Sequence, residues 1–140
     1  MKYVLLLITF FLSSQLSIVQ EKPTIKINCV APVKLKAGQS VKLKVGLIHN
    51  LKEVKKGSLV LSIFNHHTKE LENNSFLNIV PIQYFNTILH ESLEVEFPFT
   101  VPINYGDSFD VVLVAHVGNL KDSIGFVIST NKVIPFAKKS

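Results

Sequence analysis

Most of this chain alternates between apolar and polar residues with a period of two, in short runs separated by turn residues. Such alternation places every second side chain on one face of an extended strand, so it predicts half-buried β-strands. The clearest example is the run 41–47, in which Val41, Leu43, Val45 and Leu47 alternate with other residues, two of them lysines. No segment beyond residue 20 repeats its apolar residues every 3.6 positions over the length of a helix. The predicted fold class is therefore all-β.

Seven runs of this kind follow one another along the chain, separated by turn residues such as Gly, Pro and Asn. They cover residues 24–30, 41–47, 58–65, 76–84, 92–100, 109–117 and 123–129. About seven short strands in one domain are typical of an immunoglobulin-like or fibronectin III-like antiparallel β-sandwich. Pro81 interrupts the fourth run, which predicts an edge position for that strand. The sixth run is almost entirely apolar, which predicts a central strand covered on both faces.

The second and fifth runs are neighbours in a sandwich of this kind. Lys42 and Lys44 on one strand can then face Glu94 and Glu96 on the other. Cross-strand pairs of opposite charge contribute only about 0.2–1 kcal/mol each, so we expect them to serve register and solubility. The alternative is that the lysines recruit an acidic partner.

The N-terminus predicts export from the cell. Lys2 precedes a largely apolar run at 3–12, and a more polar stretch begins at Ser13, which is the layout of a cleavable signal peptide. The apolar run is shorter than the roughly 20 residues of a membrane-spanning helix, although an uncleaved anchor is the alternative. We expect a secreted protein without a membrane span after cleavage. The expected organisation is a signal peptide at 1–20, a sandwich domain at 21–130 and a C-terminal tail at 131–140.

Composition argues against several functional classes. The 15 basic residues are all Lys, and Arg is the usual residue for bidentate contacts to phosphates and bases, so nucleic acid is not an expected partner. Cys29 is the one cysteine, which excludes an intramolecular disulfide, and its position on the apolar face of its run predicts burial. No nucleophile elbow, phosphate loop or dinucleotide fingerprint occurs, so we expect no cofactor and no catalytic residues.

The histidines are the remaining source of metal chemistry. They stand at His49, His66, His67, His90 and His116. Those in the polar connection after residue 65 could converge with His49 or His90, but nothing in the spacing demands it. We therefore expect solvent-exposed loop histidines and no metal site.

Two kinds of binding or modification site emerge from the sequence. Phe97, Phe99, Phe109 and Phe126 fall on inward positions, whereas Phe64, Tyr84 and Phe85 are candidates for a small apolar contact patch. Ordinary packing is the alternative for these three. Asn73 begins the sequon Asn-Asn-Ser and is a candidate for N-glycosylation if the host is a eukaryote.

An ordered set of turns and strands resembles a known family. These elements are Ala31-Pro32, Lys36-Ala37-Gly38-Gln39-Ser40-Val41, Phe99-Thr100-Val101-Pro102, Tyr105-Gly106-Asp107-Ser108-Phe109-Asp110-Val111 and Asp122-Ser123-Ile124-Gly125-Phe126-Val127-Ile128. Together they resemble the N-terminal domain of the fungal Ser/Thr-rich, GPI-anchored cell-wall synthesis family named for yeast killer-toxin resistance, without its stalk and anchor. The resemblance implies an extracellular, non-enzymatic protein linked to β-glucan assembly.

Three hypotheses for function follow. The first is a secreted, non-catalytic binding or structural module associated with cell-wall polysaccharide. The second is a secreted effector or adhesion-type domain that binds another extracellular protein through a sheet edge or the aromatic patch. The third, and least favoured, is a small metal-dependent enzyme that uses the histidines.

Overall fold

The structure is a computed structural model that describes residues 21–88 and 91–131. The predicted signal peptide at 1–20, His90 and the tail beyond Asn131 lie outside these residues. Within them, no helix is long and apolar enough to cross a membrane.

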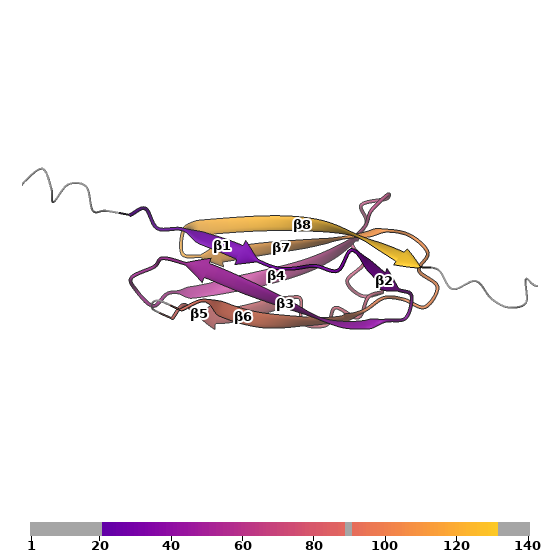
Figure 1. The fold of residues 1–140 in the computed structure, drawn as a ribbon, viewed down its shortest axis with the longest axis horizontal. Coiled ribbons are helices and arrows are strands. Elements are labelled where there is room, and N and C mark those ends of the chain that lie inside the picture. The colour runs from indigo at the N-terminus through magenta and orange to yellow at the C-terminus, as the bar shows by residue number, and fades with distance from the viewer. Residues whose placement is uncertain (1–20, 89–90, 132–140) are drawn as a thin grey trace, which may run out of the picture.

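The described residues form eight strands in two sheets, which pack face to face as an elongated sandwich (Figure 1). The strands are β1 (Ile25–Asn28), β2 (Lys34–Lys36), β3 (Ser40–His49), β4 (Lys56–Asn65), β5 (Ile82–Asn86), β6 (Leu93–Thr100), β7 (Phe109–Val117) and β8 (Leu120–Asn131). One sheet has the order β1-β3-β6 and the other β2-β8-β7-β4-β5. The all-β sandwich predicted from the alternation is confirmed. Its finer immunoglobulin-like or fibronectin III-like assignment stays a prediction.

The strand count differs from the expected seven because β2 is an additional strand. It is three residues long and pairs in parallel with the end of β8, whereas every other pairing is antiparallel among the described strands. An alternating pattern cannot be recognised over so few residues.

The fourth predicted strand, at 76–84, is wrong in its bounds. The strand β5 begins at Ile82, directly after Pro81, and the residues before it form turns and irregular backbone. Phe76 lies in one of these turns and inserts a fully buried ring into the core. Its apolar side chain was therefore interpreted as an inward strand residue, although it belongs to a loop. The predicted edge position is confirmed, since β5 pairs only with β4.

The inward side chains of both sheets form one core. Phe97, Phe99 and Phe109 are buried there as predicted, and Phe126 packs against the core while partly exposed. Full burial of a side chain of this size stabilises a fold by about 1.5–3 kcal/mol. Because these residues come from β6, β7 and β8, their contacts tie the two sheets together.

The register between β3 and β6 tests the predicted charge pairs. The two strands are antiparallel neighbours as expected, and Lys44 lies opposite Glu96. Lys42 instead lies opposite Pro98, and Glu94 opposite Gly46. No ion pair within 4 Å joins these charges in the described residues. The pairing partners were therefore predicted, but only one of the two charge pairs is directly opposed.

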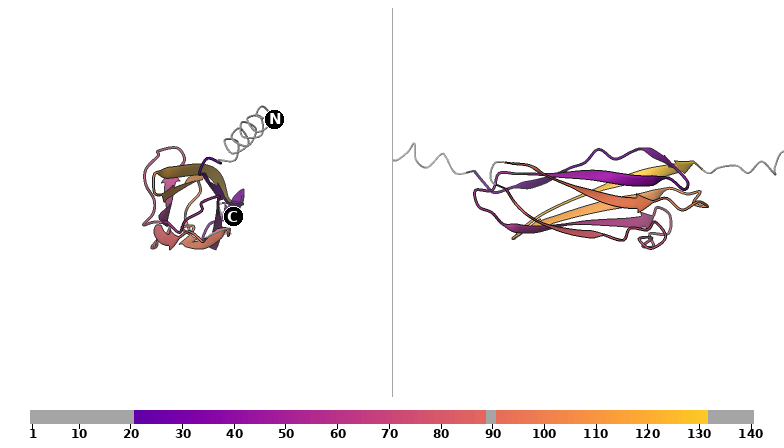
Figure 2. Two further views of the ribbon diagram at one scale, coloured as in Figure 1. Left: turned by 90° about the vertical axis from the view of Figure 1, so that its left-hand side faces the viewer. Right: turned by 90° about the horizontal axis from the view of Figure 1, so that it is seen from below.

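Side chains bridge both seams between the sheets, where the strand edges curve toward each other (Figure 2). At one seam, Asp122 Oδ2 of β8 accepts a hydrogen bond from the backbone N–H of Ile27 in β1 at 2.8 Å. At the other, the side-chain amide of Gln83 in β5 donates to the backbone carbonyl of Glu96 in β6. Occupied edge groups are poor templates for a further strand.

The edge of β6 is blocked in two more ways. Pro98 has no backbone N–H to offer. The N–H of Thr100 donates to the carbonyl of Phe76 at 2.7 Å. Consequently, much of the β6 edge is closed to strand addition, and the broad faces of the sandwich are the more accessible contact surfaces.

Candidate binding face

The three aromatic residues predicted as a contact patch lie on two sides of the five-stranded sheet. Phe64 and Tyr84 occupy outward positions of β4 and β5, and Tyr84 is 81% exposed. Phe85 points to the other side, where its ring covers Gly57 on the neighbouring strand. The structure therefore brings Phe64 and Tyr84 to one face and separates Phe85 from them.

A continuous band of outward side chains connects Phe64 to Tyr84. In the register, Val60 of β4 lies between Ile82 of β5 and Val114 of β7. We call the whole band the sheet face. Its members are Ser58, Val60, Ser62 and Phe64 of β4, Ile82 and Tyr84 of β5, Val112 and Val114 of β7, and Ser123, Gly125 and Val127 of β8. None of these residues is charged, and the charged Asp110 of β7 lies on the same side of the sheet, between Phe64 and Val127 at one end of the band.

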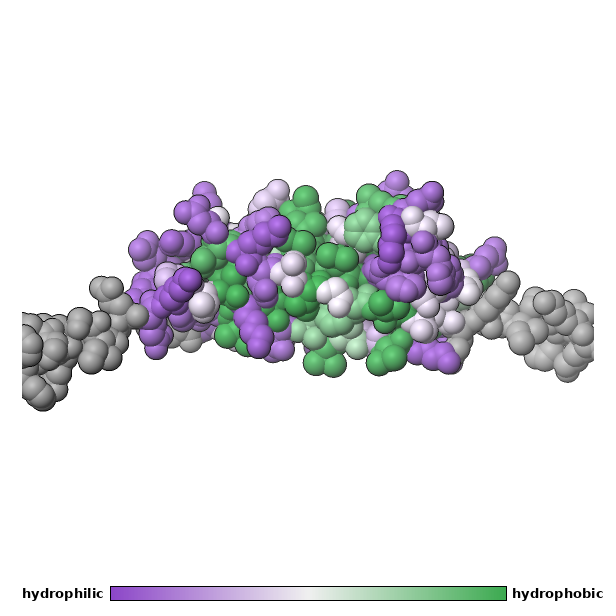
Figure 3. All heavy atoms as spheres, turned by 90° about the horizontal axis from the view of Figure 1, so that it is seen from above, coloured by the Kyte–Doolittle hydropathy of each residue, from purple (hydrophilic) through white to green (hydrophobic). Residues whose placement is uncertain are grey.

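Hydrophobic residues gather in the middle of the molecule when it is viewed from the side of β8 (Figure 3). On the sheet face, Val127 is 53% exposed and Ile82 is 44% exposed, while Val60, Val112 and Val114 are half-buried. Exposed apolar side chains that gather on one face of a sheet mark interaction sites on soluble proteins. The serines and Gly125 have small side chains that project little from the sheet, so a flat partner can approach it closely.

The central strand β7 explains why this face was not recognised in the sequence. Its inward residues are buried, and its central position between β8 and β4 is confirmed. Its outward residues Val112 and Val114 are apolar too, yet no described element covers them. Antiparallel sheets with one solvated face normally alternate apolar-in and polar-out. The sequence predicted that β7 is covered on both faces, and within the described part of this chain no element covers its outer face.

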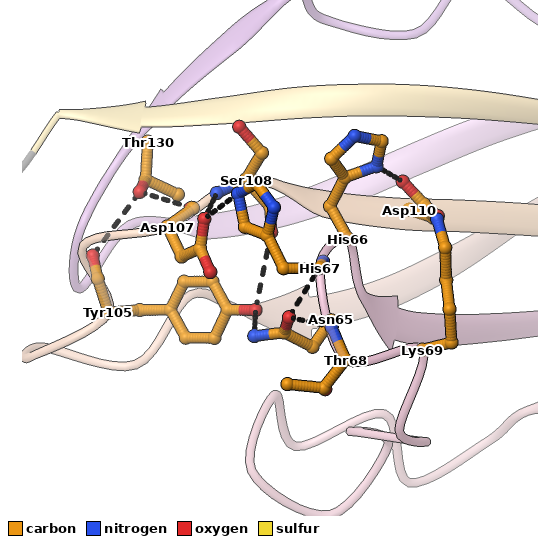
Figure 4. A network of polar contacts seen from close by, with 10 residues as sticks. All are labelled: Asn65, His66, His67, Thr68, Lys69, Tyr105, Asp107, Ser108, Asp110 and Thr130. Carbon is orange, nitrogen blue, oxygen red and sulfur yellow. Dashed lines mark hydrogen bonds and ion pairs between the residues drawn. The ribbon is translucent and has the colours of Figure 1, made fainter.

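A cluster of polar side chains lies at the end of the sheet face where β4 ends and β7 begins (Figure 4). His66 Nδ1 lies 2.6 Å from Asp110 Oδ1, and Lys69 Nζ donates to Asp110 Oδ2 at 3.0 Å. His67 Nε2 forms a second pair with Asp107 Oδ1 at 2.9 Å. These contacts join the connection after β4 to the start of β7.

Further hydrogen bonds make the same cluster a clamp between loops. Asn65 Oδ1 accepts from the backbone N–H groups of His67 and Thr68, both at 2.9 Å, and its amide donates to the Tyr105 hydroxyl at 3.0 Å. Thr130 of β8 donates to the carbonyl of Asp107 at 2.6 Å. Local bonds from an Asn side chain to the following backbone stabilise tight turns. The cluster therefore holds its loops in place.

Ionisation within the cluster follows from these contacts. Burial opposes ionisation of Asp110, but the hydrogen bonds from His66 and Lys69 outweigh it and hold the pKa of this carboxyl below its ordinary value. Burial raises the pKa of the Tyr105 phenol. An ionised Asp110 beside a neutral Tyr105 suits a structural clamp.

Opposite charges flank the two ends of the sheet face along β4 and β7. Where β4 ends and β7 begins, four acids accompany one lysine and two histidines: Glu70, Glu72, Asp107 and Asp110, with Lys69, His66 and His67. Where β4 begins and β7 ends, three lysines and a histidine accompany one acid: Lys52, Lys55, Lys56 and His116, with Glu53. The apolar band thus runs from an acidic end to a basic end.

The histidines do not gather into one site. His49 ends β3 and His66 follows β4, so the ten residues of β4 separate them along the chain. His49 Nδ1 accepts a hydrogen bond from the backbone N–H of Leu51. His116 lies at the far end of β7 from His66. Among the described residues, no group of three or more His, Cys, Asp or Glu side chains is arranged to hold a metal ion.

A second surface feature lies on the opposite sheet. An open groove of about 460 Å³ crosses the outer side of β3 and its neighbours, and Gly46 leaves room for it because it has no side chain. Its polar lining comes from Asn28, Lys42, Lys44 and Glu94. The rest of its lining is apolar, from Val30, Pro32, Val41 and Leu43, so the groove differs from the sheet face in carrying charged side chains.

Asn73 and Cys29 are both partly buried. Asn73 Oδ1 accepts hydrogen bonds from the backbone N–H of Ile63 at 2.9 Å and from the Asn78 amide at 3.1 Å. The candidate glycosylation residue thus also holds the loop between β4 and β5 in place through these two hydrogen bonds. Cys29 packs against the core, and burial raises the pKa of its thiol.

No family model and no curated protein matches this sequence. The sulfur carrier protein SoxY from Chlorobium limicola f thiosulfatophilum is 14% identical with a TM-score of 0.39, over 80% of this chain and 83% of that one. A family 123 glycoside hydrolase from Clostridium perfringens is 11% identical with a TM-score of 0.49, over 81% of this chain and 27% of that one. The SrpA adhesin from Streptococcus sanguinis is 15% identical with a TM-score of 0.48, over 82% of this chain and 60% of that one. None of these names the fungal cell-wall family, whose resemblance stays a prediction.

Proposed function

We propose that this chain is a secreted, non-catalytic binding module that contacts another extracellular protein through the sheet face. The uncovered apolar face of β7 and its neighbours is the observation that carries this proposal. The face combines exposed aliphatic and aromatic side chains with charged ends, which matches the apolar centre and polar rim of protein interfaces. The export signal predicted at residues 1–20 supports the extracellular setting.

The sequence left two modes of contact open, a sheet edge and the aromatic patch, and the strand edges argue against the first. The seams are bridged by Asp122 and Gln83, and Pro98 offers no donor on the β6 edge. A partner therefore gains more from covering the sheet face than from adding a strand. Among the candidate aromatic residues, Phe64 and Tyr84 belong to this interface and Phe85 does not.

Substitution of Val127 tests the proposal. Val127→Lys places a charge on the sheet face, whereas Ile48→Lys does so at a similarly exposed position on the outer side of the other sheet. Immobilised wild-type protein and both variants would be exposed to the fluid into which the chain is secreted. We expect a protein retained by the wild type and by Ile48→Lys to be lost with Val127→Lys. Equal retention by all three would contradict the proposal.

A second candidate function is association with cell-wall polysaccharide, as the family resemblance implies. The groove around Gly46 favours it, since Asn28 and Glu94 offer hydrogen-bonding groups to an extended sugar chain. Co-sedimentation with insoluble β-glucan and chitin measures it. We expect Asn28→Ala to weaken saturable binding and Lys26→Ala, on the same strand but outside the groove, to leave it intact. Absence of saturable binding by the wild type would remove this candidate.

A further inference from the structure

We propose that the partner of the sheet face is a second copy of this chain, packed face to face with its strands running in the opposite direction. This inference rests on the proposed function and identifies the partner. Two-fold symmetric contacts use the same patch on both subunits, so the patch must be complementary to itself. The sheet face meets that condition in shape and in charge.

The shape condition follows from the flat, uncharged centre. The small residues Ser62 of β4 and Gly125 of β8 lie on either side of Val112. Two sheets with such surfaces can approach to the spacing of about 10 Å that is usual for stacked sheets. The two copies would then form a second apolar layer outside the core of each sandwich.

The charge condition selects the orientation. A two-fold axis that lies between the sheets and runs across the strands keeps β4 on β4 and β7 on β7 but reverses their direction. The acidic end of one copy, with Glu70 and Asp107, then meets the basic end of the other, with Lys55 and Lys56. An axis along the strands would bring acid onto acid and lysine onto lysine, which is unfavourable. Symmetry makes the favourable contact occur twice.

The area available is sufficient for a reversible dimer. Four strands about 4.8 Å apart, with about seven residues each at about 3.3 Å per residue, give a face of about 440 Å². The charged connections at both ends extend this toward the roughly 800 Å² per partner of a standard interface. We therefore expect association at micromolar rather than nanomolar concentration.

Sedimentation velocity of the secreted protein over a range of concentrations tests the dimer. We expect a monomer–dimer equilibrium that Val127→Lys and Val112→Lys each weaken at least tenfold and that Ile48→Lys leaves unchanged. Circular dichroism and thermal unfolding establish that each variant folds, and Val127→Lys is the safer variant because its side chain is already half exposed. Weak specific interfaces associate at about 1 µM and above. A wild type that stays monomeric up to about 100 µM, a concentration 100-fold higher, would overturn the inference.

Charge reversal tests the orientation. Lys56→Glu alone and Glu70→Lys alone should each weaken the dimer several-fold, and the two together in one chain should restore it. Failure of the combined variant to recover would overturn the reversed arrangement. A monomeric wild type that still loses an extracellular partner through Val127→Lys would overturn the self-association but leave the proposed function standing. No effect of Val127→Lys on either measurement would overturn both.

Discussion

Asp110 is the residue whose ionisation most directly stabilises a loop end of the molecule. Its carboxylate receives hydrogen bonds from His66 and Lys69, and its pKa lies below the ordinary 3.8. A group with a lowered folded-state pKa stabilises the fold at pH values above its unfolded pKa, and this contribution is lost as the pH falls through the folded-state pKa. The clamp around Asp110 should therefore weaken only in acid.

We expect Asp110→Asn to unfold at a lower temperature than the wild type at neutral pH. The difference should shrink as the pH falls below the ordinary carboxyl value of 3.8 and through the lowered pKa of Asp110, because the wild-type carboxyl is then protonated as well. Thermal unfolding followed by circular dichroism across this pH range measures it. Glu70→Gln, an exposed acid outside the clamp, is the control. A constant difference between Asp110→Asn and the wild type at every pH would contradict this explanation.

Asn73 accepts hydrogen bonds within the fold and also begins a glycosylation sequon, and substitutions can separate these two roles. Its side-chain oxygen accepts from the backbone N–H of Ile63, a part-buried donor. A buried donor left without a partner costs about 1–3 kcal/mol, so we expect Asn73→Ala to lower the free energy of unfolding by this amount. Urea unfolding of unglycosylated protein measures the change.

Ser75→Ala provides the matched control for Asn73→Ala. It removes the sequon while it leaves the Asn73 side chain and both of its hydrogen bonds in place. We expect its unfolding free energy to stay within about 0.5 kcal/mol of the wild type, as for most surface substitutions. Equal destabilisation by both variants would show that the hydrogen bonds of Asn73 are not the cause.

The pairing of β4 with β5 depends on a glycine that has no room for a side chain. A Cβ at Gly57 would lie 2.6 Å from the Phe85 ring and 2.8 Å from the carbonyl of His116. Overpacking of this kind typically costs about 1–3 kcal/mol, so we expect Gly57→Ala to destabilise the protein by that amount. In Gly125→Ala the nearest atom lies at 3.8 Å, and we expect little loss. Denaturant unfolding of both variants measures the contrast, and equal losses would contradict it.

Strands were predicted correctly where the alternation extends over many residues. The prediction failed where a loop residue is buried or where a strand is too short to show a period. The strands β3, β4 and β6 follow the period-two pattern closely, since each turns every second side chain toward the core. Phe76 misled the pattern because a loop can also bury an aromatic anchor. The short β2 carries too few residues for any period to be read.

The candidate site was predictable only in part, for a related reason. Tyr84 and Phe64 stand out in the sequence as aromatic residues, and both belong to the sheet face. Val112 and Val114 do not stand out, because a run of apolar residues reads the same whether its second face is covered by this chain or by a partner. Only the register of β7 against β4 and β8 shows that their face is open.

At the scale of the whole molecule, the sandwich closes through side chains that reach across its seams. Asp122 of β8 accepts from the backbone of Ile27 in β1, so one carboxylate connects strands of different sheets. The hydrogen bond holds β1 against β8 where no strand pairing joins the two sheets. It also occupies an edge donor that would otherwise invite another chain.

We expect Asp122→Ala to loosen β1 without unfolding the rest of the sandwich. Hydrogen exchange should show faster exchange of the Ile27 amide, while the amides of β4 and β7 at the sheet centre stay protected, because local opening involves the least-supported elements first. Asp122→Asn retains an oxygen that can accept the same bond and should restore most of the protection at Ile27. If Ile27 exchanged equally in the wild type and in Asp122→Ala, the seam would be closed by packing of the two sheets alone, and the carboxylate would serve solubility rather than closure.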